Sequence, residues 1–226
     1  MKRSLLISLF AFAPVMSSVM SSVTSSAAAP PAASASSAVP APNSPTAVLK
    51  SKNGEVDKLL RQKVEAGSAA EAKQKAEIKV LAGTLLDYAE LTKRAMAEHW
   101  EKISAAQRSD LVATLKELIE RNYVKQIRSN LDYQIQYTDE KITGAEASVM
   151  SIVKVKTKGK STDAEIVYKL RKVSAPEGEK WLVWDVVTDE VSLMRNYKSQ
   201  FHRIITESGF DELLRKMKKK LAENKD

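Results

Sequence analysis

Cysteine is absent from all 226 residues of the sequence. Disulfide bonds, thiolate metal sites and a cysteine nucleophile are therefore excluded. Histidine is scarce as well, because His99 and His202 are the only two. Neither has a second histidine or a carboxylate at the spacing of a zinc site, and Glu98, beside His99, is expected to face elsewhere on a helix. We therefore predict no metal site and interpret both histidines as surface or structural residues.

Catalytic motifs are missing too. The sequence has no Gly-x-Ser-x-Gly elbow, no phosphate-binding loop and no dinucleotide-binding fingerprint. We therefore expect no catalytic residue and no cofactor. One carboxylate stands apart, because Asp185 lies within the most apolar segment, Trp181–Val187. It is either a general base whose pKa burial would raise, or a structural residue paired with Arg195 or with the Tyr197 hydroxyl. We favour the structural interpretation.

No apolar run is long enough to cross a bilayer comfortably. The best candidate, Leu5–Met16, is short and contains Pro14. It follows the basic pair Lys2-Arg3 and precedes a small-residue stretch in which Ser26-Ala27-Ala28 fits a cleavage motif. We interpret residues 1–28 as a cleaved signal peptide rather than a retained anchor. Because no cysteine follows it, lipid attachment there is excluded, and the mature protein is expected to be exported and soluble.

Large side chains are almost absent between residues 29 and 46, where Ala, Ser and Pro dominate. Such a segment buries too little apolar surface to offset the entropy of ordering, so we predict a disordered tether. One folded domain is expected over residues 47–226. The formal charge of +8 is compatible with nucleic acid, anionic lipid headgroups or an acidic partner. Export excludes nucleic acid from this group.

Apolar residues recur at helical spacing on both sides of a central region where they alternate instead. Ser104 and Gln107 form a capping box, which predicts the start of the longest helix. The helical segments are Glu55–Ala66, a stretch from Glu71 to Leu86, Tyr88–Trp100, Ala105–Ile127, a stretch from about Arg195 to Gly209, and Phe210–Leu221. The strands are Leu131–Tyr137, Ala145–Val155, Ala164–Leu170 and Trp181–Val187, with turns at Gly144, Gly159 and Pro176–Gly178. This order predicts an α+β domain with an antiparallel sheet of about four strands.

Two blocks of the sequence resemble the MlaC family of periplasmic phospholipid carriers. The first contains Trp181, Trp184-Asp185-Val186, Glu190-Val191-Ser192-Leu193, Asn196–Phe201 and Gly209. The second contains Leu91–Met96, His99-Trp100 and Gln107-Arg108. Together the resemblance runs from about Val48 to the C-terminus. Members of this family assist an ABC transport system that maintains lipid asymmetry in the outer membrane of Gram-negative bacteria.

The resemblance implies a more specific architecture and function than the pattern of residues does. It implies a cone-like fold, in which a curved sheet wraps helices around an apolar cavity. It also implies a monomeric, non-enzymatic periplasmic carrier whose partners are an outer-membrane lipoprotein complex and an inner-membrane ABC transporter with a substrate-binding ring. The side chains expected to bind the phospholipid are Leu115, Ile119, Tyr123, Val149, Val153, Val155, Ile166, Tyr168, Leu170, Trp184, Val186, Val191, Leu193, Tyr197 and Phe201.

Two other interpretations remain open at this point. The same apolar residues could form a dry core, in which case the protein would be a periplasmic adaptor that binds other proteins. Alternatively, it could be a small enzyme on the same fold that uses Asp185. The basic run Arg215–Lys220 is either a solvated helix face or a docking surface for anionic headgroups or acidic proteins.

Overall fold

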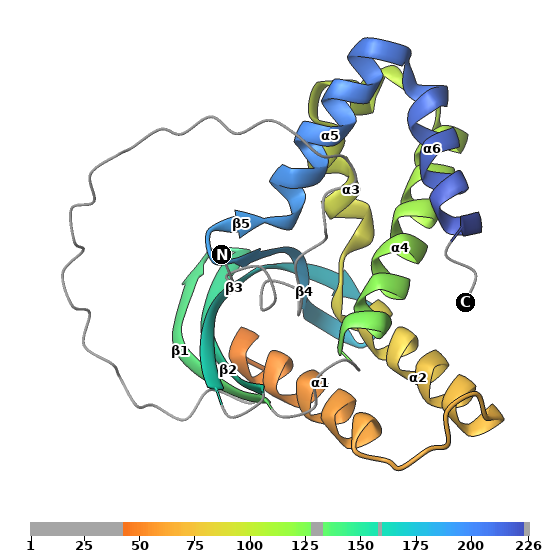
Figure 1. Cartoon of the computed structure of the whole chain (residues 1–226). Helices are drawn as coiled ribbons and strands as arrows, with labels where there is room; N and C mark the ends of the chain where they lie inside the picture. Colours follow the sequence, from red (N-terminus) through yellow and green to blue (C-terminus); the bar gives the residue numbers. More distant parts are fainter. Residues whose placement is uncertain (1–42, 128–132, 158–159, 224–226) are drawn as a thin grey trace.

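The computed structural model describes residues 43–127, 133–157 and 160–223. The predicted α+β class is confirmed. Helices come both before and after the strands in the sequence (Figure 1). The elements are α1 (Pro45–Leu60), α2 (Ala69–Leu85), α3 (Tyr88–Met96), the 3-10 helix η2 (Ala97–Lys102), α4 (Ala105–Ile127), β1 (Tyr133–Thr143), β2 (Glu146–Thr157), β3 (Lys160–Ala175), β4 (Gly178–Thr188), β5 (Val191–Ser192), α5 (Leu193–Ser208) and α6 (Phe210–Glu223).

Helix α1 begins and ends earlier than Glu55–Ala66, the minimum span predicted for it, since it runs over Pro45–Leu60. Ser44 caps it, since the Ser44 hydroxyl accepts a hydrogen bond from Ala47 N at 3.2 Å, and Pro45 takes a place in the first turn. Pro45 and Thr46 are buried, so the last residues of the predicted tether belong to the folded domain. The predicted signal peptide and residues 29–42 of the predicted tether lie outside the described residues.

The capping box predicted at the start of α4 is confirmed. Gln107 N donates to the Ser104 hydroxyl at 3.2 Å, and Ser104 N donates to Gln107 Oε1 at 2.9 Å. The predicted helix over Tyr88–Trp100 instead divides in two, because the chain turns at Ala97, where φ is 46°. Its second part, η2, continues as a 3-10 helix that leads toward α4.

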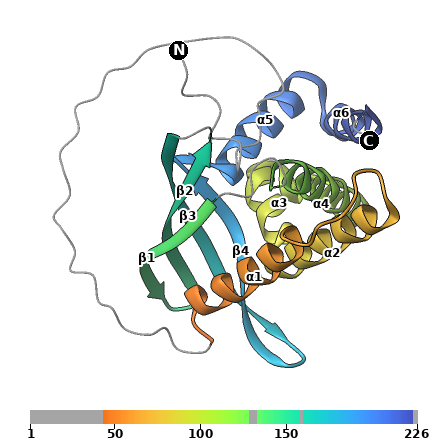
Figure 2. The ribbon, with the colours of Figure 1, turned by 60° about the horizontal axis from the view of Figure 1, so that its bottom comes forward.

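The sheet is an antiparallel meander with the strand order β1-β2-β3-β4-β5, and it is strongly curved (Figure 1). Strand β4 pairs with β3 along its length but with β5 only at Val187 and Thr188. Most of its apolar residues are buried, because helices α2, α3 and α5 pack against it. Helix α1 runs across the sheet toward α2 (Figure 2). The prediction of about four strands is confirmed, with the two-residue β5 added at the edge.

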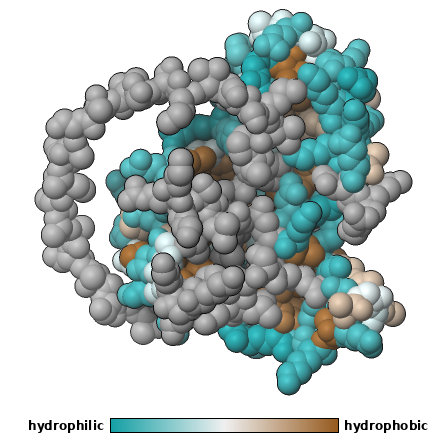
Figure 3. All heavy atoms as spheres, viewed as in Figure 1, coloured by the Kyte–Doolittle hydropathy of each residue, from teal (hydrophilic) through white to brown (hydrophobic). Residues whose placement is uncertain are grey.

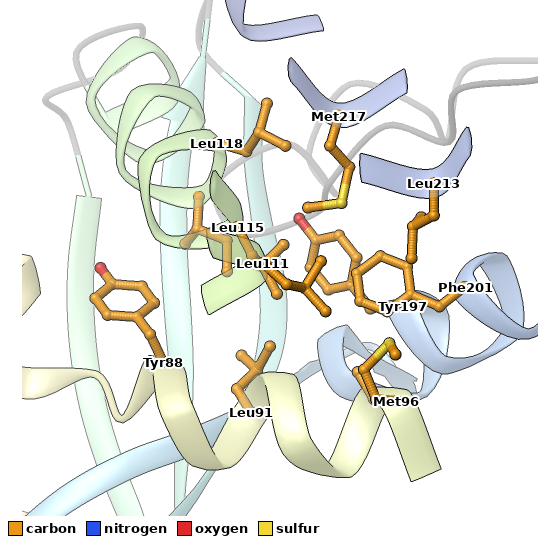
Figure 4. Packing of buried hydrophobic residues seen from close by; sticks show 12 residues of the cluster. Tyr88, Leu91, Met96, Leu111, Leu115, Leu118, Tyr197, Phe201, Leu213 and Met217 are labelled. Atoms are coloured by element: carbon orange, nitrogen blue, oxygen red, sulfur yellow. The ribbon is translucent and has the colours of Figure 1, made fainter. Parts of the chain in front are cut away.

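Within the part of the chain that the structure describes, buried side chains form three clusters. The sheet cluster joins residues of β2, β3 and β4 to Leu49 of α1. The helical cluster lies among α3, α4, α5 and α6, where Leu111 and Leu115 face Leu91 and Tyr197 (Figure 4). A third and smaller cluster contains Val56, Leu60, Ile78 and Val124, so it joins α1, α2 and α4.

Hydrophilic residues dominate the surface over α5 and α6 in the view of Figure 3. Helix α6 is amphipathic, with Leu213 and Met217 buried, while Lys218 pairs with Asp110 of α4 at 2.7 Å. Within the described residues, no helix has the length and apolar character needed to cross a membrane.

Candidate functional site

A pocket of about 800 Å³ lies where the three buried clusters meet. This volume includes solvent space at the mouth, so the enclosed part is smaller. Apolar and aromatic side chains form most of the wall. The full lining consists of Lys52, Asn53, Val56, Leu81, Ala82, Leu85, Leu86, Ile119, Asn122, Tyr123, Tyr168, Val183, Val186 and Leu193.

The pocket's wall is built by one face of each surrounding helix and by strands β3 and β4. Leu81 and Leu85 are four positions apart at the end of α2, and Ile119 and Tyr123 are four positions apart on α4, so each pair points to one side. The junction between α2 and α3 is fixed to the sheet, because Asp87 N donates to the Val183 carbonyl at 2.7 Å. That hydrogen bond holds the end of α2 beside β4.

Polar side chains enter the lining from α1 and α4. Asn53 Nδ2 donates to the Tyr137 hydroxyl at 2.6 Å, which connects α1 to β1. Lys52 pairs with Glu55 on the same helix, at 3.1 Å. Asn122 is the polar residue contributed by α4. The site therefore combines a largely apolar wall with a few hydrogen-bonding groups, which is the usual composition of a pocket for an apolar ligand.

The two tyrosines of the pocket stay uncharged at any physiological pH. Burial raises the pKa of Tyr123 and of Tyr168 well above the ordinary value. Burial likewise raises the pKa of Tyr137, to about 12, although its hydrogen bond with Asn53 acts in the opposite direction. The pocket consequently presents phenol groups rather than negative charge to any bound molecule.

The structure brings some of the predicted site residues together and separates others. Five of them line the pocket, namely Ile119, Tyr123, Tyr168, Val186 and Leu193. Val149, Val153, Val155, Ile166 and Leu170 lie in the buried sheet cluster. Leu115, Tyr197 and Phe201 pack in the helical cluster, where Tyr197 contacts Phe201 with ring centroids 5.5 Å apart.

Two further predicted residues lie outside the pocket lining. Val191 is 53% exposed at the surface. Trp184 is buried, and the Arg94 guanidinium of α3 lies 3.8 Å from the centre of its ring. The cause is a register shift in the pairing of β3 with β4, where Lys169 pairs with Asp185 but the next residue, Leu170, pairs with Val183. Trp184 is therefore the extra residue of a β-bulge and contacts α3 instead.

Sequence reasoning missed the contribution of α1 and α2 to the pocket. Val56, Leu81, Ala82, Leu85 and Leu86 belong to helical stripes that the apolar spacing does indicate. That spacing cannot tell which part of a stripe packs tightly and which part borders a pocket. Val183 was missed because the bulge at Trp184 changes the alternation along β4.

Asp185 forms hydrogen bonds where β4 meets α5, although not with the predicted partners. Its carboxylate accepts one hydrogen bond from the Ser192 hydroxyl at 2.7 Å and another from Met194 N at 2.9 Å. Each carboxylate oxygen therefore accepts one hydrogen bond at the start of α5. Asp185 does not border the pocket.

The prediction that the two histidines have no suitable neighbour is wrong. Packing of α3 and η2 against α5 places His99 Nε2 3.1 Å from His202 Nδ1. Glu98, expected to face elsewhere, has its Oε1 3.0 Å from His202 Nδ1 and 3.7 Å from His99 Nε2. The sequence separates the histidines by about a hundred residues, so spacing rules could not have found this cluster.

Comparison with known proteins places this architecture in a family. The sequence model of the MlaC protein family matches residues 50–219, which is most of the chain. The chain belongs to the MlaC family. The intermembrane phospholipid transport system binding protein MlaC of Haemophilus influenzae is 24% identical over 147 residues, which cover 64% of this chain and 68% of that protein.

A solved structure shares the fold. It is the phospholipid-binding protein from Ralstonia solanacearum in complex with a phospholipid, with a TM-score of 0.64 and 19% sequence identity. The match covers 80% of this chain and 98% of that one. The agreement confirms the resemblance to the MlaC family and the fold class inferred from the sequence.

Proposed function

We propose that this protein is a periplasmic phospholipid carrier, which binds the lipid tails in the pocket between α1, α2, α4 and the sheet. The observation that carries the proposal is the apolar pocket in a member of the MlaC family. Phospholipid binding by the Ralstonia relative of the same fold supports this assignment.

The physical requirement for such a carrier is to keep acyl chains out of water. Exposure costs about 0.8 kcal/mol per methylene, so on the order of 20 kcal/mol for a whole phospholipid. Val56, Leu85 and Val186 offer the apolar contacts that would offset this cost. Such contacts have no direction, so the site is expected to accept tails of different length.

The headgroup needs polar surroundings, which the lining offers on α1 and α4. We place it near Lys52, Asn53 and Asn122, which are the charged and amide side chains of the pocket. Lys52 could approach a phosphate while Glu55 balances its charge in the unloaded state. This arrangement leaves the headgroup hydrated and buries only the tails.

The proposed cycle is non-catalytic. The protein takes a phospholipid from one membrane complex, crosses the periplasm and releases it at another, and so helps to maintain outer-membrane lipid asymmetry. The partners are an outer-membrane lipoprotein complex and an inner-membrane ABC transporter with a substrate-binding ring. Because loss of the lipid into water is so costly, release requires a partner that opens the pocket. An enzyme based on Asp185 is disfavoured, because that carboxylate does not border the pocket and instead accepts hydrogen bonds at the start of α5.

The test is native mass spectrometry of the protein purified from bacterial periplasm without detergent, followed by organic extraction of the ligand. We expect a mass increment equal to one or two phospholipids, and phospholipid in the extract. A correctly folded protein without any ligand would contradict the carrier proposal. The adaptor with a dry core would then be the better interpretation.

A further inference from the structure

Glu98, His99 and His202 form a cluster of metal-ligating side chains away from the pocket. One ligand atom from each of the three lies within 4.8 Å of the other two. His99 and Glu98 come from η2, and His202 comes from α5. Their rings and carboxylate are not used in the proposed carriage of lipid, since none of them borders the pocket.

A turn of the backbone directs Glu98 and His99 together toward α5. Neighbouring side chains of a helix diverge by roughly 100°, but here both reach His202. Ala97 has a φ of 46°, an uncommon value for a residue other than glycine, and it turns the chain from α3 into η2. After that turn, the carboxylate of Glu98 and the imidazole of His99 both approach His202.

The distances within the cluster match those between ligands of one metal ion. Two atoms that bind a tetrahedral Zn²⁺ at about 2.0–2.1 Å lie about 3.3–3.4 Å from each other. The three separations here are 3.0, 3.1 and 3.7 Å. Three atoms so arranged are all about 1.9 Å from one central point in their plane, so an ion slightly above that plane would reach each at a normal bond length.

The chemistry and exposure of the cluster also suit a metal. Imidazole nitrogen favours Zn²⁺, Cu²⁺ and Ni²⁺ over the hard cations Mg²⁺ and Ca²⁺. The His99 side chain is only 13% exposed and forms the buried side of the cluster. The side chains of His202 and Glu98 are 56% and 53% exposed. An ion could therefore enter from solvent and keep water as its fourth ligand.

We propose that Glu98 Oε1, His99 Nε2 and His202 Nδ1 bind one divalent transition-metal ion of the zinc type. The ion would connect η2 to α5, two segments that no disulfide can join because the chain has no cysteine. Its binding would stabilise the folded chain, since a ligand that binds only the native state raises the melting temperature. The site is independent of lipid binding.

The experiment uses the full chain without a polyhistidine tag, treated with EDTA and then exchanged into chelator-free buffer. ZnCl₂ is titrated by calorimetry, and CoCl₂ is titrated by visible absorption, which reports the coordination geometry. We expect saturation at one ion per chain, reversal by EDTA, and a higher melting temperature with Zn²⁺. Absence of saturable binding at millimolar Zn²⁺ would overturn the proposal and leave a hydrogen-bonded cluster of side chains.

Variants identify the ligands. His202→Ala is expected to weaken metal binding more than about hundredfold. Loss of a residue that only orients a metal ligand already lowers metal affinity about 10–100-fold. Glu98→Gln should weaken it at least about tenfold. Glu101→Gln is the matched control, since Glu101 lies in the same 3-10 helix and pairs with Arg108 instead. Unchanged affinity in His202→Ala or Glu98→Gln, with normal circular dichroism, would refute this ligand set even if His99→Ala failed to fold.

Discussion

The Ser192 hydroxyl donates a hydrogen bond to Asp185 at 2.7 Å and accepts one from Arg195 N at 3.0 Å. Both side chains are buried. Since Asp185 also accepts from Met194 N, the last full strand of the sheet and the first turn of α5 share one network of hydrogen bonds. This network fixes the orientation of α5 relative to the sheet. Leu193, which lines the pocket, lies between Ser192 and Met194 in the sequence.

Removal of the Asp185 carboxylate is expected to destabilise the protein. Asp185→Ala leaves the Ser192 hydroxyl and Met194 N without this acceptor, which should cost about 2–4 kcal/mol in the free energy of unfolding. Asp185→Asn keeps one acceptor oxygen and should cost about half as much. Urea denaturation measures both. Glu190→Gln is the control, because the exposed side chain of Glu190 should change stability by less than about 0.5 kcal/mol. Equal stability of Asp185→Ala and wild type would contradict the structural role.

Blocking the pocket from α2 should abolish lipid loading. Ala82 is buried and lines the pocket, so the ring introduced by Ala82→Phe would fill the space in which we propose that the acyl chains bind. We expect at least about a tenfold loss of co-purifying phospholipid, measured by extraction and mass spectrometry. Ala76→Phe adds the same ring to an exposed position of the same helix and should retain the lipid. Normal lipid content in a folded Ala82→Phe protein would mean that the tails bind elsewhere.

Local features of this fold could be predicted, whereas features that depend on packing between distant segments could not. The capping box at Ser104 and Gln107 is specified within four residues, and the change from helical to alternating spacing predicts where the sheet begins. Ser44 and Pro45 also form a helix-start signal, but their Ala, Ser and Pro-rich context hid it.

The site was less predictable because it depends on three-dimensional contacts. A bulge in β4 moves Trp184 to α3 and gives Val183 a place at the pocket. Nothing in the alternation of apolar residues marks such an extra residue. The proximity of His99 and His202 likewise arises only when η2 packs against α5. A cavity also depends on contacts between distant segments. An apolar stripe in the sequence therefore predicts which residues are buried but not which of them line a cavity.

Glu120 is expected to make the stability of the protein depend on pH. Burial raises the pKa of this carboxyl above its ordinary value. The nearby Lys116 and Lys79 lower that pKa, but their effect is smaller than the effect of burial. The folded state therefore binds the proton more tightly than the unfolded state, so this group's contribution to stability falls as pH rises from the ordinary carboxyl range through the raised pKa. Glu120→Gln removes the buried charge and should raise the melting temperature relative to wild type at pH 7. The gain should vanish near pH 4, where wild-type Glu120 is largely protonated.

The matched control for this prediction is Glu117→Gln, three residues earlier on α4, whose side chain is more exposed and pairs with Arg121. It should not raise the melting temperature at pH 7. Thermal melts of the three proteins at pH 4 and pH 7 decide the matter. A Glu120→Gln protein that is less stable than wild type at pH 7 would show that the charge of Glu120 is favourable in the folded state.

The hydrogen bond between Asn53 and Tyr137 is expected to hold α1 over the pocket and slow the loss of lipid. It joins a lining residue of α1 to β1 at 2.6 Å. If α1 moves away during release, losing a bond worth about 1 kcal/mol should speed transfer of a fluorescent phospholipid to acceptor vesicles roughly fivefold. Asn53→Ala and Tyr137→Phe both remove this bond, and Asn53→Ala also removes the hydrogen bond of Asn53 with Tyr168. The double variant should therefore transfer lipid no faster than Asn53→Ala alone. Rates that multiply in the double variant would show that the two side chains act independently and that this contact does not restrain α1.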